Sequence, residues 1–145
     1  EGVALAEQAI KDGSGFRKLR ELMMAQGGDV SYVDDLSKLP KASFVESVYA
    51  DKAGWAAVVD AKDVGETSVM LGAGREQKGG QIDQAVGIMV RVKIGDPVTR
   101  GQVLFEIHAN DPRKLQQAKE RLKEAVKIVD KPVEKPPYFY GVIGI

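Results

Sequence analysis

The chain has 145 residues, of which 43% are hydrophobic and 29% charged, a balance typical of a globular protein. Its 21 basic and 21 acidic side chains cancel, so no net charge attracts it to nucleic acid or to an anionic membrane. The absence of cysteine and the single histidine exclude disulfides, thiolate metal sites and multi-histidine metal sites. No apolar run approaches the ~20 residues that a membrane span needs, so we expect a cytoplasmic protein.

The first 40 residues have a helical pattern. Apolar residues at helical spacing predict two helices: Val3, Ala6, Ala9 and Ile10 mark the first, and Phe16, Leu19, Leu22 and Met23 the second. No capping residue precedes the first helix, which suggests a piece of a longer chain. Gly27 and Gly28 are expected to end the second helix, because glycine adopts the left-handed conformation found after many helices.

A connector follows from Asp29 to Pro40, and it is the best candidate for a boundary between two segments, residues 1–40 and residues 41–145. Two adjacent acids, Asp34 and Asp35, lie within it. Paired carboxylates can bind a divalent cation, but no third oxygen ligand is near in sequence. We therefore expect a solvated turn or a helix cap there rather than a metal site.

Two strands and a capped helix are predicted next. Residues 42–50 and 55–59 alternate apolar with polar or small side chains, as strands do. Asp60 is placed to cap a short helix that ends at Gly72. The glycine loop that begins at Leu71 and includes Arg75 invites a phosphate interpretation, because backbone amides can approach an anion there. A phosphate loop normally leads into a helix, however, and this one follows a helix, so a helix end terminated by glycine is favoured.

The stretch from Ala85 to His108 organises the whole chain. Five branched residues with a period of two (Val86, Ile88, Val90, Val92 and Ile94) predict one long strand. Gly95, Asp96 and Pro97 then predict a turn, and Val103, Phe105 and Ile107 a second strand. Gly95, Asp96, Val98, Gly101 and Leu104 resemble the corner of barrel-sandwich domains such as biotinyl and lipoyl carriers. A carrier attaches its cofactor to a lysine shortly after such a corner, and residues 108–112 contain none.

A last helix is predicted from Pro112, with Asp111 as its cap. Its buried stripe is expected to continue to Val129, and its outer face carries more basic than acidic side chains. No aromatic residues alternate with these charges, so we expect a solvated face rather than a nucleic-acid interface. The prolines of residues 131–137 predict an extended connector, and residues 138–143 a closing edge strand.

His108 could act as the base of an independent hydrolase, since it is the one histidine in the chain. Its alternation with Val103, Phe105 and Ile107 places it instead on the strand face that carries Leu104 and Glu106. We therefore expect a partly exposed histidine in a structural role or in a salt bridge.

Several short motifs together resemble the C-terminal part of pyrimidine-nucleoside phosphorylases and thymidine phosphorylases. They are, in order, residues 26–29, residues 71–75, Ile82-Asp83 with residues 85–87, Gly95-Asp96, and Gly101. The resemblance implies an α+β fold, in which residues 41–145 form an α/β-hammerhead domain with a barrel-sandwich-like corner. Residues 1–40 would then be helices and a connector from the end of a larger α/β domain.

The resemblance also implies an activity for the parent enzyme. Such enzymes are homodimers that cleave thymidine, deoxyuridine or uridine with inorganic phosphate, giving a pentose 1-phosphate and the free base. The lysine, serine and threonine that hold phosphate, and the arginine, serine and lysine that hold the base, lie in the N-terminal half of those enzymes. This chain has no position that corresponds to them, so we assign it no catalytic, substrate-binding or metal-binding residue and no cofactor.

Two functions remain open at this point. The first is an accessory C-terminal domain of such an enzyme, inactive alone, whose partner is the rest of that enzyme. The loop at residues 71–80 is then expected to lie near the active-site cleft. The second is a stand-alone binding or carrier-like module that uses the barrel-sandwich corner without chemistry of its own.

Overall fold

The computed structural model describes residues 1–75 and 77–144. The chain divides into two units, Glu1–Leu39 and Pro40–Ile145. The first unit consists of helices, and the second contains every strand of the described residues.

The first unit contains three α-helices and a 3₁₀ turn, in the order α1 (Gly2–Lys11), α2 (Ser14–Ala25), α3 (Ser31–Asp34) and the turn Leu36–Lys38. The two predicted helices are confirmed, and Gly27 has the expected positive φ of 75°. None of the residues in these helices is buried. Ile10 of α1 is 80% exposed and Leu22 of α2 is 53% exposed. The apolar stripes of this unit therefore have no covering surface within the unit itself.

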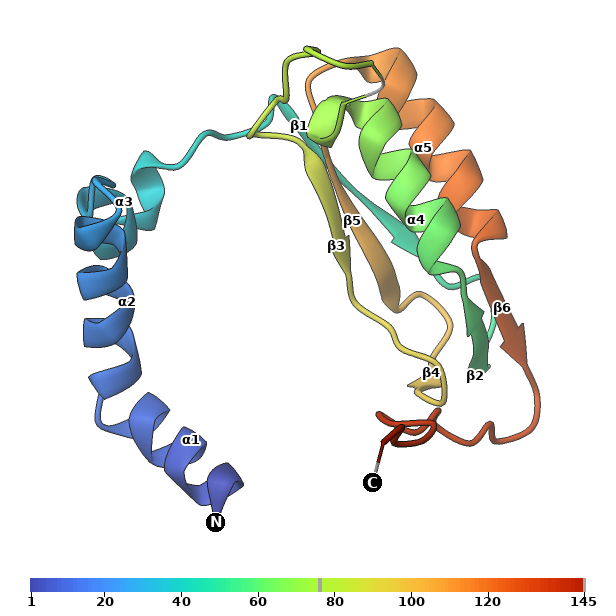
Figure 1. The fold of residues 1–145 in the computed structure, drawn as a ribbon. Helices are drawn as coiled ribbons and strands as arrows, with labels where there is room; N and C mark the ends of the chain where they lie inside the picture. Colours follow the sequence, from blue (N-terminus) through green and yellow to red (C-terminus); the bar gives the residue numbers. More distant parts are fainter. Residues whose placement is uncertain (76, 145) are drawn as a thin grey trace. The chain divides into compact units, whose positions relative to one another are not determined.

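The described residues of the second unit form six strands and two α-helices (Figure 1). Its elements in chain order are β1 (Phe44–Tyr49), β2 (Gly54–Val59), α4 (Ala61–Ser68), a π-helical turn (Val69–Ala73), β3 (Gly87–Val90), β4 (Pro97–Val98), β5 (Val103–Ala109), α5 (Pro112–Glu124) and β6 (Val126–Val129). They form two antiparallel sheets with strand orders β1-β5-β3 and β4-β2-β6. The mixed α+β class is confirmed, but the described strands form two open sheets rather than a closed barrel.

Local sequence signals place most of these elements. Asp60 caps α4 by accepting hydrogen bonds from the amides of Lys62 and Asp63, and Asp111 caps α5 through the amides of Arg113 and Lys114. Each cap satisfies backbone donors that have no partner inside the helix. The predicted caps of both helices are therefore confirmed.

The corner between β3 and β5 moves the chain from one sheet to the other. β3 and β5 pair antiparallel, with Val90 opposite Phe105. The intervening β4 pairs instead with β2 of the second sheet, after a turn in which Gly95 has φ 85°. The predicted strand over residues 86–94 is confirmed only for Gly87–Val90, and its continuation to Ile94 is wrong, because the chain leaves the first sheet there. Val90 itself is 45% exposed, although Val92 beyond it is buried.

A single apolar core lies between the first sheet and the two helices, α4 and α5, which lie side by side (Figure 1). Phe105 and Ile107 of β5, Leu122 of α5 and Val48 of β1 are its largest fully buried side chains apart from Val92. The predicted stripe of α5 is confirmed at Leu115, Ala118 and Leu122. This packing fixes α5 on β1 and β5 and so positions the loops at both ends of α5.

The segment after α5 differs from the prediction of a continuous helix to Val129. α5 ends at Glu124, and Val126 to Val129 form β6, which pairs antiparallel with β2. The spacing of Val126 and Val129 fits a helix, but these residues are β-branched and lie opposite the strand Gly54–Val59. Pairing with a distant strand therefore decides the structure here.

The predicted closing strand at residues 138–143 is also wrong, since no strand follows β6 among the described residues. Tyr138 is 99% exposed, and the apolar side chains after it are exposed as well. Just before this segment, Nζ of Lys135 donates a hydrogen bond of 2.9 Å to Oδ1 of Asp96, which connects the chain to the turn before β4. None of the described helices is long and apolar enough to cross a membrane.

Candidate functional site

The glycine loop that begins at Leu71 is closed by a backbone hydrogen bond between its two ends. The amide of Asp83 donates a hydrogen bond of 2.9 Å to the carbonyl oxygen of Gly72. Gly72 has φ 114°, a conformation that residues with a side chain rarely adopt, so the helical chain ends there as predicted. Arg75 lies between the two ends and is exposed. The bond between Asp83 and Gly72 therefore brings the two ends of this segment together.

Asn110 ties this loop to the start of the second unit. Its side-chain oxygen accepts hydrogen bonds from the amide and the hydroxyl of Ser43, at 2.8 and 2.9 Å. Its side-chain nitrogen donates to Oδ2 of Asp83 at 2.7 Å. The other Asp83 oxygen accepts from the amide of Ala85 at 2.9 Å. One asparagine therefore holds together three segments that are far apart in the sequence.

A hollow of about 490 Å³ lies beside this network, and its lining includes Asp83, Asn110, Asp111 and Lys114. The amide of Ala85 and the side chain of Asn110 lower the pKa of Asp83. The amides of Lys114 and Arg113 lower the pKa of Asp111. Both carboxylates are thus ionised at neutral pH, and the lining of the hollow adds one lysine, Lys114. This charge opposes phosphate binding.

The phosphate interpretation of residues 71–75 also lacks the backbone geometry that it needs. The glycine loop follows a π-helical turn and does not lead into the first turn of a helix. The nearest helix start is that of α5, and the Asp111 carboxylate already binds its amides. The expected helix end with a terminal glycine is the arrangement that the structure shows.

Lowering the pH should weaken the cap of α5. The folded-state pKa of Asp111 lies below the ordinary value of 3.8, so the carboxylate stabilises the fold above that value. This contribution should be lost as the pH falls through the folded-state pKa. We expect Asp111→Asn to make the melting temperature less dependent on pH between about pH 5 and pH 2. Thermal unfolding followed by circular dichroism at several pH values measures the effect.

Asp130→Asn is the matched control for this experiment, because the Asp130 side chain forms no hydrogen bond with the described residues. Its melting temperature should follow that of the unmodified chain across the same pH range. An Asp111→Asn variant with the full pH dependence of the unmodified chain would contradict the assignment.

The adjacent acids of the connector have separate structural roles. Asp34 forms an ion pair of 2.9 Å with Arg20 of α2. Asp35 caps the following 3₁₀ turn by accepting from the amide of Ser37. Neither carboxylate is therefore available as part of a paired cation site. No group of three or more potential metal ligands occurs in residues 1–75 and 77–144.

His108 is partly exposed and lies beside a carboxylate, as expected for a histidine in a structural role or in a salt bridge. Its Nε2 lies 3.0 Å from Oε1 of Glu106, and its side chain is 33% exposed. Arg91 approaches the same carboxylate oxygen at 3.7 Å. The side-chain contact of His108 is thus with a carboxylate, which suits the structural role expected for it.

The basic face of α5 is partly neutralised within the second unit. Lys119 contacts Glu46 of β1 at 2.6 Å, and Arg121 contacts Glu66 of α4 at 3.1 Å. After β5 the chain passes through Asn110 and Asp111 directly into α5, so the described residues that follow the corner form no hairpin tip for a carrier lysine.

The tie made by Asn110 could not be found from the sequence. Ser43 and Asp83, its two side-chain partners, lie 67 and 27 residues away along the chain. The only local signal is the Asp111-Pro112 helix start that follows it. Distant partners of this kind become visible only when the strands are paired.

Comparison with known proteins identifies this architecture. The family model described as "Pyrimidine nucleoside phosphorylase C-terminal domain" matches residues 55–129, which run from β2 to the end of β6. A pyrimidine-nucleoside phosphorylase of Geobacillus stearothermophilus is 39% identical over 140 residues, which cover 97% of this chain and 32% of that protein. One of Bacillus subtilis (strain 168) is 43% identical over 110 residues, covering 76% of this chain and 25% of that protein. The chain thus spans between a quarter and a third of these relatives.

Proposed function

The chain belongs to the pyrimidine nucleoside phosphorylase C-terminal domain family, and on this basis we propose that it is the C-terminal portion of such an enzyme. The parent enzyme converts a pyrimidine nucleoside and inorganic phosphate into a pentose 1-phosphate and the free base. This portion is an accessory domain without catalytic residues. The observation that carries the proposal is the family match over the sheets and helices of the second unit.

The chemistry of phosphorolysis supports an accessory role for this chain. The reaction needs fixed positive charge for phosphate and hydrogen-bond donors for the departing base. The hollow beside the glycine loop has two carboxylates and one lysine instead. The catalytic groups therefore belong to the rest of the parent, which is a cytoplasmic homodimer and the partner of this domain. The second unit then corresponds to the family's α/β-hammerhead, and the first to the end of its larger α/β domain.

Within this proposal, the loop from Leu71 to Gly80 lies near the active-site cleft of the parent and helps to close it. Its base is fixed by the bond between Asp83 and Gly72, whereas Arg75 is exposed. A fixed base with an exposed cation suits a loop that closes over an anionic substrate.

Replacing Arg75 with alanine in the complete enzyme should lower kcat/KM about tenfold, the order expected for one charge-assisted hydrogen bond. The measurement is steady-state kinetics with phosphate and nucleoside varied separately. Lys131→Ala, which also removes an exposed cation, should leave kcat and KM unchanged. If Arg75→Ala leaves kcat and KM unchanged for both substrates, the loop takes no part in the mechanism.

The proposed function is tested by assaying phosphate-dependent release of uracil and thymine. The 145-residue chain and the complete protein from the same reading frame are compared, each with and without phosphate. We expect release only from the complete protein and only with phosphate. Nucleoside cleavage by the chain alone, or none by the complete protein, would refute the proposal. A reading frame that starts just before Glu1 would favour the stand-alone binding module instead.

A further inference from the structure

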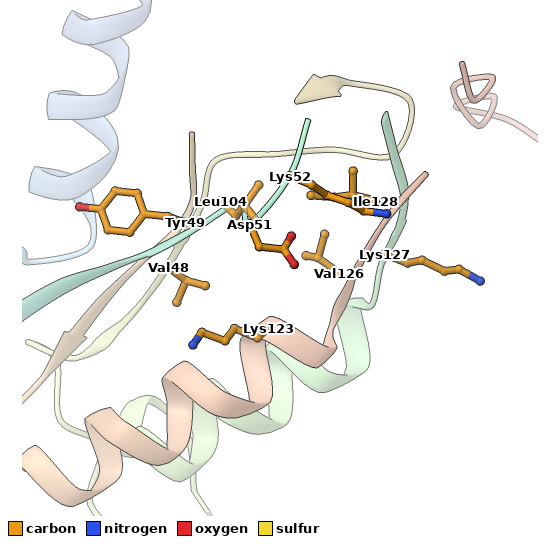
Figure 2. Close-up of a pocket in the computed structure, with 9 residues that line it drawn as sticks. All are labelled: Val48, Tyr49, Asp51, Lys52, Leu104, Lys123, Val126, Lys127 and Ile128. Atoms are coloured by element: carbon orange, nitrogen blue, oxygen red, sulfur yellow. The ribbon is translucent and has the colours of Figure 1, made fainter. Parts of the chain in front are cut away.

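A second cavity, of about 410 Å³, lies at the opposite end of α5 from the glycine loop, between that helix, β6 and the turn after β1 (Figure 2). Its volume falls within the range of about 300–1,000 Å³ that is usual for small-molecule sites. It belongs entirely to the second unit and shares no lining residue with the hollow beside Asp83. None of the roles described above uses it.

The floor of this cavity is apolar. Val48 and Leu104 are buried at 1% and 4% exposure, and the half-buried Val126 and Ile128 continue the surface. Such a floor favours an apolar molecule over water. All four residues lie in the paired strands β1, β5 and β6, so this surface is already formed in the absence of a ligand.

The rim of the cavity is fixed by two irregularities of the strands. A β-bulge between Val48 and Tyr49 shifts the register of β1 against β5, and Tyr49 stands on the rim. Gly54 ends the following turn with φ 154° and packs against the backbone of Val129 in β6. Bulges commonly redirect side chains beside functional sites. The turn that carries Asp51 and Lys52 is therefore fixed at both ends.

The charged side chains of the rim have no partners of their own. Lys52, Lys123 and Lys127 form no ion pair, and Asp51 forms neither an ion pair nor a hydrogen bond, within residues 1–75 and 77–144. In contrast, Lys119 and Arg121, nearer the start of α5, are both engaged by glutamates. Figure 2 shows Lys123 extending on the side of Val48, Lys52 on the side of Ile128, and Asp51 between them, whereas Lys127 points away from the cavity on the other side of β6.

We propose that this cavity binds a small organic anion with an apolar body, such as an aromatic carboxylate. The apolar body lies on Val126 and Ile128, with Val48 and Leu104 packed beneath them, and Lys52 and Lys123 supply a positive potential that exceeds the single negative charge of Asp51. The cavity is a binding site and needs no chemical step. This inference does not depend on the proposed function, since it uses only the second unit of this chain.

The test is a titration of the ¹⁵N-labelled 145-residue chain followed by NMR. The anionic probe is phenylacetate, and 2-phenylethanol is a neutral probe with the same ring. Phenylacetate should bind saturably, shift the amides of residues 48–52 and 123–128, and bind at least about threefold more tightly than 2-phenylethanol.

Three variants separate charge from shape. Lys52→Gln and Lys123→Gln should each weaken phenylacetate binding about two- to fivefold, as expected for exposed charges, while 2-phenylethanol binding stays the same. Asp51→Asn should strengthen phenylacetate binding about twofold or more, because it removes an opposing charge. Lys41→Gln, an exposed lysine that does not line the cavity, is the matched control and should change nothing.

Each other outcome overturns the proposal. Equal binding of phenylacetate and 2-phenylethanol would show that charge is not recognised. Shifts confined to other residues, or the absence of saturation at about 20 mM probe, would show that the cavity is not the site. If Lys41→Gln weakened phenylacetate binding as much as Lys52→Gln and Lys123→Gln do, the attraction would be nonspecific. Unchanged phenylacetate affinity in Asp51→Asn would lead to the same conclusion.

Discussion

Replacing Phe105 with alanine is expected to lower the free energy of unfolding of the second unit by about 3–5 kcal/mol. The side chain is completely buried and lies on β5, the central strand of the first sheet, between Val48 of β1 and Val90 of β3. Its loss removes apolar contacts and leaves a cavity that the paired strands cannot close. A domain with a typical stability of about 5–15 kcal/mol would lose a large part of it. Urea unfolding followed by circular dichroism measures the change.

Phe139→Ala is the matched control, since Phe139 is 84% exposed and lies in the segment after β6. It should change the free energy of unfolding by less than about 0.5 kcal/mol. Should Phe105→Ala not fold at all, Phe105→Leu keeps most of the volume and should lose about 1–2 kcal/mol. Equal effects of Phe105→Ala and Phe139→Ala would mean that β5 is not the centre of the core.

Gly54→Ala is the second substitution with a large expected effect. A Cβ atom at Gly54 would lie 2.4 Å from the carbonyl oxygen of Val129 and 2.8 Å from Cγ2 of Ile128. The residue also has φ 154°, which strains any residue with a side chain. Because both contacts are with β6, relief of the clash separates β2 from β6. We expect a loss of about 3 kcal/mol or more, measured by the same urea unfolding.

Gly65→Ala tests whether this effect comes from the site rather than from glycine replacement in general. Gly65 lies inside α4, and a Cβ atom there would meet nothing within 4 Å. Alanine should stabilise the helix by about 0.4–1 kcal/mol, because it restricts the unfolded chain. The two variants should therefore change stability in opposite directions. Destabilisation by both would show that the close approach at Gly54 is not the cause.

The sequence predicts the features that depend on a few neighbouring residues. Asp60 and Asp111 predict the starts of α4 and α5, because a carboxylate before a helix accepts hydrogen bonds from the amides two and three residues later. Gly95 predicts a turn, because residues other than glycine rarely adopt its φ of 85°. Such signals need no knowledge of the rest of the fold, and the structure confirms them.

Features that depend on distant partners could not be predicted in the same way. Val126 and Val129 fit a helical stripe, and only the position of β2 makes them a strand. The alternation from Val86 to Ile94 suggests one strand, but the chain changes sheets within it. The segment after Pro137 has the composition of a strand and finds no partner strand in the described residues. In the first two cases long-range strand pairing overrides the local pattern, and in the third no strand pairs with the segment.

The candidate sites also combine features that neighbouring residues predict with features that depend on distant residues. The glycine loop is visible in the sequence because glycines and Arg75 lie together, but its fastening by Asn110 involves residues far away. The cavity at the end of α5 is less visible still, since its floor comes from β1, β5 and β6 and its rim from a turn and a helix. No stretch of the sequence contains enough of it to form a motif.

The strand pairing has a consequence for how the second unit forms during synthesis. Phe44 lies opposite Ala109, and Trp55 lies opposite Val129, so each sheet joins early and late parts of the chain. Contacts between segments so distant along a polypeptide slow folding, because a long loop must close before any stabilising contact forms. We therefore expect β1 and β2 to leave the ribosome without partners and the unit to acquire its native structure only after β6 has been translated.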